Sequence, residues 1–190
     1  MCIRDRAYAA LRDALAQAED YRRNPAAFGG REKDSMVKRG DAQALLRVLD
    51  GSVPLVVHVE RASDILTVLA LPREYPKLKL VLTGVTEGWM VAREIAAARV
   101  PVIAAALADL PAQFESLGAT ESNVGRMRAA GVQVALASTG NNGGEHNLRQ
   151  YAGNLVAITR VPGHTGLTWG EALAAITSGP VSYTHLRAHE

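Results

Sequence analysis

Four short apolar segments alternate with helical segments along this chain, and this alternation limits the fold more than any other feature of the sequence. The four segments are rich in β-branched residues and are apolar at successive positions, which is typical of strands covered on both faces. They occupy residues 53–59 (VPLVVHV), 78–84 (LKLVLTG), 100–106 (VPVIAAA) and 132–138 (VQVALAS). Apolar residues at helical spacing lie between them. Strands and helices in alternation predict an α/β fold with a parallel sheet.

The region before the first predicted strand contains a polar stretch. Residues 24–40 are polar and include glycines, which predicts a long loop. Asp41 follows this stretch and is predicted to cap a short helix that has leucines on one face.

A capping signal marks the last predicted helix. Thr168 and Glu171 have the spacing of a capping box, in which each side chain accepts a hydrogen bond from the other residue's backbone. The spacing of the apolar residues that follow predicts that the helix buries Trp169, Ala172, Leu173 and Ile176.

Two architectures are compatible with four β-α units in series. One is an open doubly wound sheet, and the other is half of an eight-stranded barrel. A complete (β/α)8 barrel takes about 250 residues, more than the 190 of this chain. A half barrel would leave segments 53–59 and 132–138 as open edge strands. The pattern alone favours neither architecture.

Both ends of the sequence are compatible with translated sequencing-library adapter. The first six residues, MCIRDR, and the segment PVSYTH at 180–185 can be back-translated into strings that are reverse complements over about 17 bases. We therefore expect residues 1–6 and 181–190 to be adapter-derived and residues 7–180 to be the protein domain, truncated at both ends. This expectation sets aside the only cysteine, Cys2, and makes a leader peptide and the localisation impossible to assess.

The charge balance and the hydropathy exclude two classes of partner. The 21 Lys and Arg residues face 19 Asp and Glu residues, giving a formal net charge of +2 without long runs of one sign, so nucleic-acid binding is not expected. The longest apolar stretch, 100–108, is interrupted by Pro101, so no membrane-spanning helix is expected. The expected partner is a small molecule bound at the carboxyl ends of the strands, where ligands bind in both architectures.

His58 is the most informative residue at these strand ends. It lies at the carboxyl end of the first predicted strand, where a neutral imidazole can bind a divalent metal while an acceptor fixes its other nitrogen. The alternative is a core histidine that is hydrogen-bonded to its neighbours. The glycine-containing loop 83–88 has Met90 where a dinucleotide-binding loop would have its third glycine, so a simple glycine turn is favoured there.

Several strings in the chain together resemble the C-terminal half of an amidohydrolase-superfamily enzyme of the imidazolonepropionase-like branch. The resemblance implies a partial (β/α)8 barrel in which the four strands are the fifth to the eighth, followed by a C-terminal helix. The strings are VPLVVHVERASDI (53–65), LKLVLTGVTEGW (78–89), VPVI (100–103), AAGVQVALAST (129–139), NLRQYAGN (147–154) and GLTWGEALAAIT (166–177).

The same resemblance implies hydrolysis of a C–N bond, in an amide or a cyclic amide, by a metal-activated water. It makes His58 a metal ligand, Glu87 a candidate catalytic residue, and Thr83 and Thr139 candidate substrate-binding residues. One divalent ion, zinc, is expected in the complete protein, and the isolated segment is expected to be inactive. The alternative is a non-catalytic homologue that binds a small ligand at the barrel mouth.

Two positions depart from the pattern that the resemblance implies. Thr83 stands where the sixth strand is expected to end in histidine, and no aspartate occurs between Gly131 and Gly144, where the eighth strand ends. Because a threonine hydroxyl is a poor ligand for a divalent ion, a site with more than one tightly bound ion is not expected. Glu145, His146 and His164 are predicted to lie at the surface.

Overall fold

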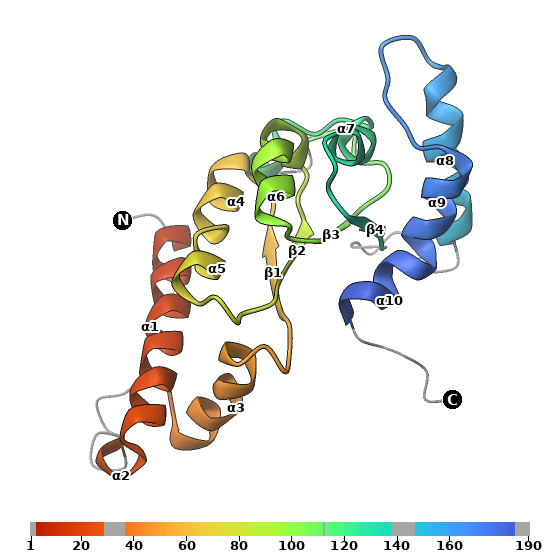
Figure 1. Cartoon of the computed structure of the whole chain (residues 1–190). Helices are drawn as coiled ribbons and strands as arrows, with labels where there is room; N and C mark the ends of the chain where they lie inside the picture. The colour runs from red at the N-terminus through yellow and green to blue at the C-terminus, as the bar shows by residue number, and fades with distance from the viewer. Residues whose placement is uncertain (1–2, 29–36, 112, 138–146, 185–190) are drawn as a thin grey trace, which may run out of the picture. The chain divides into compact units, whose positions relative to one another are not determined.

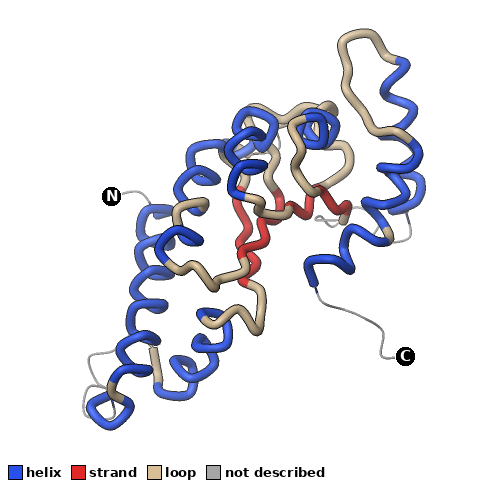
Figure 2. The backbone as a smooth tube through the Cα atoms, in the orientation of Figure 1, coloured by secondary structure: helices blue, strands red, loops and turns tan. Residues whose placement is uncertain are grey.

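The computed structural model describes residues 3–28, 37–111, 113–137 and 147–184, and it is a mixed α/β structure. Its sheet has four strands in the order β1-β2-β3-β4, so each strand lies beside the next one in sequence (Figures 1 and 2). The pairings of β2 with β3 and of β3 with β4 are parallel. The chain divides into two compact units, residues 1–55 with 72–79, and residues 56–71 with 80–190.

The first unit is mainly helical. It contains α1 (Ile3–Arg23), α2 (Pro25–Phe28) and α3 (Arg39–Leu49), with α1 packed on α3. Tyr21, Val37 and Ala42 form its buried cluster. The prediction of one continuous loop over 24–40 is wrong at both ends, because Pro25 is suited to the first position of a helix and α3 already begins at Arg39.

Asp41 does not cap α3. The cap position is Lys38, which makes no side-chain capping hydrogen bond, and Asp41 lies inside the first turn. A carboxylate in the first turn still interacts favourably with the positive end of the helix dipole. The sequence therefore predicted the helix start to within three residues, but the role assigned to Asp41 was wrong.

The second unit contains most of the sheet and the helices that follow its strands. All four predicted strands are present, in shortened form. The strands and the helices that connect them follow in this order: β1 (Leu55–Val59), α4 (Ala62–Val68), α5 (Leu71–Glu74), β2 (Leu80–Gly84), η1 (Gly88–Val91), α6 (Ala92–Ala98), β3 (Val102–Ala104), η2 (Phe114–Ser116), α7 (Asn123–Ala129) and β4 (Val134–Leu136). The chain then forms α8 (Leu148–Ala157), η4 (Ile158–Arg160), α9 (Trp169–Ile176) and α10 (Ser178–Thr184).

The two faces of the sheet follow from the register. Leu82, Val102 and Val134 are partners in neighbouring strands and are all buried. Two residues further along, on the same face, Ala104 and Leu136 are partners and are buried as well. The other face has the row Thr83, Ile103 and Ala135, because successive strand residues point to opposite faces. Fully buried Ile65, Ile95 and Met127 are contributed by the helices that follow the first three strands.

β1 departs from the prediction that its segment is covered on both faces. Val56 is 53% exposed, and the His58 side chain is 60% exposed. Both residues lie on the same face of β1, which is an edge strand of the described sheet. The prediction that β1 and β4 are edge strands is confirmed for the described sheet. The exposure of Val56 and His58 shows that one face of β1 is uncovered.

α9 confirms the predicted capping box and only part of the predicted buried face, since Ala172 is buried and Ile176 is partly buried. The Thr168 side chain accepts from the Glu171 backbone N–H, and the Glu171 carboxylate accepts from the Thr168 backbone N–H. Trp169 and Leu173 are nevertheless exposed, at 73% and 61%. The buried residues of α9 are Ala172 and Ala175, because the helix packs against both α8 and β4 and small side chains permit that close approach.

The helices at the two ends extend across the boundaries expected from the adapter interpretation. α1 begins at Ile3 and α10 ends at Thr184, while Arg6 and Val181 are exposed. Whether residues 1–6 and 181–190 are foreign to the domain stays a prediction. Among the described helices, none combines the length and the apolar character needed to cross a membrane.

The capping box gives a first testable prediction. Hydrogen bonds from the Thr168 backbone and side chain, followed by Arg128, lower the pKa of the Glu171 carboxyl. We expect Thr168→Ala to reduce the free energy of unfolding by about 1 kcal/mol near neutral pH. Because the folded-state pKa is depressed, the stability that Glu171 contributes is present above its unfolded pKa and is lost as the pH falls through its folded pKa.

The difference between the wild-type protein and Thr168→Ala should therefore shrink as the pH falls below about 4. Urea denaturation at a series of pH values measures this difference. Thr67→Ala is the control, because the Thr67 hydroxyl donates to the Ser63 carbonyl within α4 and caps no helix. A difference that is constant across the pH series would contradict the prediction.

Candidate functional site

The loops that follow β1, β2 and β3 are joined by polar contacts at the carboxyl ends of these strands. The chain turns sharply after β2, where Gly84 has φ +84° and Val85 has φ +55°. The Val85 backbone N–H donates to the Val59 carbonyl at 2.6 Å, and the Glu87 N–H donates to the Glu60 carbonyl at 2.9 Å. The turn after β2 is therefore fixed to the end of β1 by backbone hydrogen bonds.

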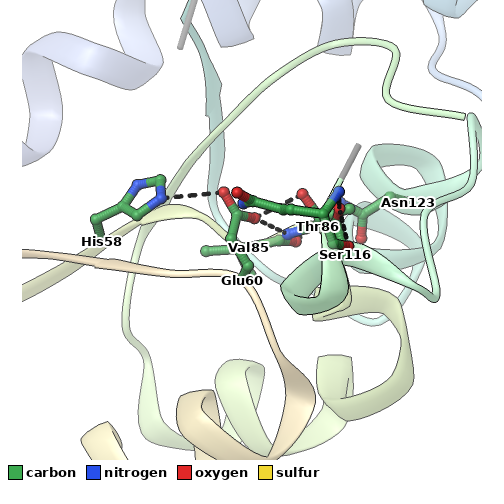
Figure 3. Close-up of polar contacts among 7 residues, drawn as sticks. His58, Glu60, Val85, Thr86, Ser116 and Asn123 are labelled. Atoms are coloured by element: carbon green, nitrogen blue, oxygen red, sulfur yellow. Dashed lines mark hydrogen bonds and ion pairs between the residues drawn. The ribbon is translucent and has the colours of Figure 1, made fainter. Parts of the chain in front are cut away.

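The side chains of His58 and Glu60 are in contact at the end of β1. His58 Nε2 lies 3.1 Å from Glu60 Oε1 (Figure 3). The two side chains differ in exposure, since 60% of the imidazole is accessible to solvent but only 13% of the carboxylate. A carboxylate acceptor therefore lies near one nitrogen of His58, and most of the ring is exposed to solvent. That His58 binds a metal stays a prediction.

Glu60 is in turn held by Thr86. Glu60 Oε2 accepts from the Thr86 backbone N–H at 2.9 Å and from the Thr86 hydroxyl at 2.6 Å. Glu60 is not distinguished by any motif in the sequence. The available signal is its spacing of two from His58, which places both residues on one side of an extended segment.

Glu87 connects the loops after β1 and β3. Its Oε2 accepts from the Ala62 N–H and its Oε1 from the Gly118 N–H, both at 3.0 Å. Gly118 lies close beneath it, since an added Cβ there would come 3.2 Å from Glu87 Cγ. Both carboxylate oxygens are thus engaged by backbone donors, a geometry suited to holding loops. That Glu87 is catalytic stays a prediction.

Trp89 and Asn123 extend this network towards α7. Asn123 is 5% exposed; its Nδ2 donates to the Val85 carbonyl at 2.9 Å, and its Oδ1 accepts from the Trp89 N–H at 3.0 Å. Trp89 Nε1 donates to the Gly118 carbonyl at 2.8 Å, and the Arg126 guanidinium lies 4.6 Å from the centroid of the Trp89 ring. The loop after β3 is therefore fixed through both Glu87 and Trp89.

The other predicted site residues lie in different parts of the chain. Thr83 is half-buried in β2, level with Ile103 and Ala135. Thr139, Glu145 and His146 lie outside the described residues. His164 is partly exposed in the loop before α9, with its Nε2 3.6 Å from Glu121 Oε2, in agreement with the predicted surface position.

The side chains that the structure describes do not complete a divalent metal site. Catalytic zinc is held by three protein ligands, whereas no group of three His, Cys, Asp or Glu side chains that could hold an ion occurs within the described ranges. His58 and Glu60 are two such side chains, and the hydroxyl of Thr83 is a poor substitute for a third.

Comparison with known proteins supports the fold. A scan against protein-family models and a search of curated proteins gave no match. Among solved structures, the chain is similar to an amidohydrolase from Thermotoga maritima MSB8, with a TM-score of 0.77 and 20% sequence identity over 94% of this chain and 45% of that one. The chain thus spans less than half the length of that protein. This likeness shows that the fold is that of part of a (β/α)8 barrel and not an open doubly wound sheet.

The Glu87 contacts give a second testable prediction. Glu87→Ala leaves the N–H groups of Ala62 and Gly118 without their acceptor, so we expect a loss of about 1–3 kcal/mol in the free energy of unfolding. Amide hydrogen exchange at both positions should become faster. Glu94→Ala on α6 is the control, because Glu94 is exposed. Unchanged exchange at Gly118 would show that Glu87 does not hold the loop after β3.

Proposed function

We propose that this chain forms part of an amidohydrolase-like hydrolase that acts on the C–N bond of a small amide or cyclic amide. The proposal is supported by the barrel fold and by one observation above all: an accessible imidazole, His58, stands at a strand end with one nitrogen against a shielded carboxylate. Active sites of such barrels lie at this end of the strands. The fold by itself does not determine the reaction.

The chemistry available to His58 follows from the hydrogen-bonding inventory. Nε2 lies 3.1 Å from a carboxylate oxygen, which only accepts when it is ionised, so a neutral imidazole is favoured with its proton on Nε2, where a lone pair would be repelled by the carboxylate. Nδ1 then has a free lone pair, which can accept a proton from a reacting group or bind a cation. The zinc ion expected from the resemblance stays a prediction, because the described residues do not complete its ligand set.

A second candidate is a homologue that binds a small ligand at the mouth without hydrolysing it. Thr83 favours this candidate, since a threonine hydroxyl can hydrogen-bond a ligand but cannot act as a general base near neutral pH. Thr83 lies in the row of residues that includes Ile103 and Ala135 on one face of the sheet. A ligand at this end of β2 would then contact the Thr83 hydroxyl, since Ala135 is buried in a cluster with Ile103.

The third testable prediction distinguishes these candidates. The intact protein that contains this sequence is assayed against a panel of small amides and cyclic amides, and its metal content is measured by elemental analysis. We expect His58→Ala to lower kcat/KM by about 100-fold or more, with at most one equivalent of tightly bound divalent ion in the wild-type protein. His164→Ala is the control and should leave turnover unchanged, because His164 lies in a different loop and contacts Glu121.

The outcomes of these measurements distinguish a hydrolase from a non-catalytic homologue. Ligand binding without turnover would favour the non-catalytic candidate. Unchanged turnover in His58→Ala would show that His58 takes no part in the reaction and has a structural role instead. Two equivalents of metal would contradict the prediction drawn from Thr83 and from the missing aspartate.

A further inference from the structure

We propose that Glu60 is a positioning residue, which holds His58 as the tautomer protonated on Nε2 and is itself kept in place by the left-handed turn at Gly84–Val85. The inference rests on the proposed function only for its consequence, that Nδ1 is the atom that meets the substrate. The tautomer itself is a property of the fold and can be measured without turnover.

Both carboxylate oxygens of Glu60 have contacts with neighbouring residues. Oε1 faces His58 Nε2, and Oε2 accepts from both the backbone N–H and the hydroxyl of Thr86. Hydrogen bonds to an ionised carboxylate are stronger than those between neutral groups. With its Oε2 fixed by two donors, the carboxylate cannot rotate freely, so Oε1 stays directed at the imidazole. Glu60 thus acts through His58.

The turn aims Thr86 at Glu60. Val85 is fully buried and has φ +55°, which is an unfavourable conformation for a β-branched residue. Such strain persists only where the surroundings impose it, and it is common at functional sites. Here the Val85 N–H is bound by the Val59 carbonyl, and the Val85 carbonyl is bound by the Asn123 side chain. The next residue, Thr86, is thereby presented to Glu60.

The turn also leaves room for the pair. A Cβ added at Gly84 would lie 2.6 Å from Glu60 Oε1 and 2.8 Å from His58 Cε1. These distances are too short for ordinary contact, so a side chain at this position would displace both residues. Gly84 therefore serves two purposes: it adopts φ +84° and it allows His58 and Glu60 to approach the backbone of β2.

The Glu60→Gln variant tests the tautomer directly. The Thr86 N–H is a donor and still requires an acceptor, so the amide oxygen of Gln should face Thr86. Its NH2 group then points at His58 Nε2, which must become an acceptor. We therefore expect the wild-type chain to have His58 protonated on Nε2 and Glu60→Gln to have it protonated mainly on Nδ1. A loss of charge alone would not cause this inversion.

The measurement is the ¹⁵N–¹H correlation spectrum of histidine-labelled protein in the pH range where the spectrum itself shows the imidazole to be neutral. His58→Ala assigns the resonances, and His164 provides an internal reference whose tautomer should not change. Turnover, if present, should fall by about 10–100-fold in Glu60→Gln, as is typical for partners of site histidines.

Two glycine variants test the role of the turn. Gly84→Ala and Gly131→Ala impose a similar backbone strain, since φ is +84° and +91°, but an added Cβ at Gly131 meets nothing within 4 Å. We expect the His58 ring resonances to shift in Gly84→Ala and to remain unchanged in Gly131→Ala. If Gly84→Ala does not fold, Glu60→Gln alone decides the proposal.

Retention of the Nε2-protonated tautomer in Glu60→Gln would overturn the proposal, as would unchanged His58 resonances in a folded Gly84→Ala. Either result, combined with activity that still depends on His58, would remove the positioning role of Glu60 and leave the proposed function standing. If Glu60→Gln inverts the tautomer but the protein hydrolyses no amide, the positioning role of Glu60 stands and the proposed function is contradicted.

Discussion

Backbone N–H groups at the carboxyl ends of parallel strands need acceptors, and two carboxylates meet this need where the loops of this protein converge. Glu60 accepts from Thr86, while Glu87 accepts from Ala62 and Gly118. Buried or half-buried donors without partners are costly, so these contacts determine where the loops lie. The arrangement that stabilises the loops also directs the accessible imidazole of His58, and for this reason the stability of the loops and the geometry of the site are linked.

The sheet supports this arrangement because both of its faces are largely covered over β2, β3 and β4 and only β1 is open on one side. One face is buried in successive rows, from Leu82 to Val134 and from Ala104 to Leu136. The exposed residues of β1, Val56 and His58, lie on a single side of that edge strand. A rigid sheet with helices on its buried face can hold short connections in place, and polar residues on those connections are then free to differ between proteins that share the fold.

Likeness of fold and likeness of site have to be judged separately for this chain. The match to the Thermotoga maritima amidohydrolase extends over 94% of the chain at 20% identity, and it concerns the arrangement of strands and helices. The side chains at the strand ends include Thr83, whose hydroxyl has a different chemistry from that of a metal-binding imidazole. The barrel architecture is therefore established, whereas the reaction depends on the few polar groups at its mouth.

The sequence by itself determined the alternation of strands and helices, the presence of all four strands, and the capping box at Thr168, because each depends on local spacing and hydrogen bonding. It also indicated His58 as a candidate site residue, because a histidine at the end of an apolar strand is unusual. It could not distinguish an open sheet from part of a barrel, since both have the same local pattern, and it placed Trp169 on the wrong face of its helix. Only the tertiary structure brought Glu60 to Thr86 and Glu87 to Gly118, because these partners are separated by 26 and 31 residues and meet through the parallel packing of strands.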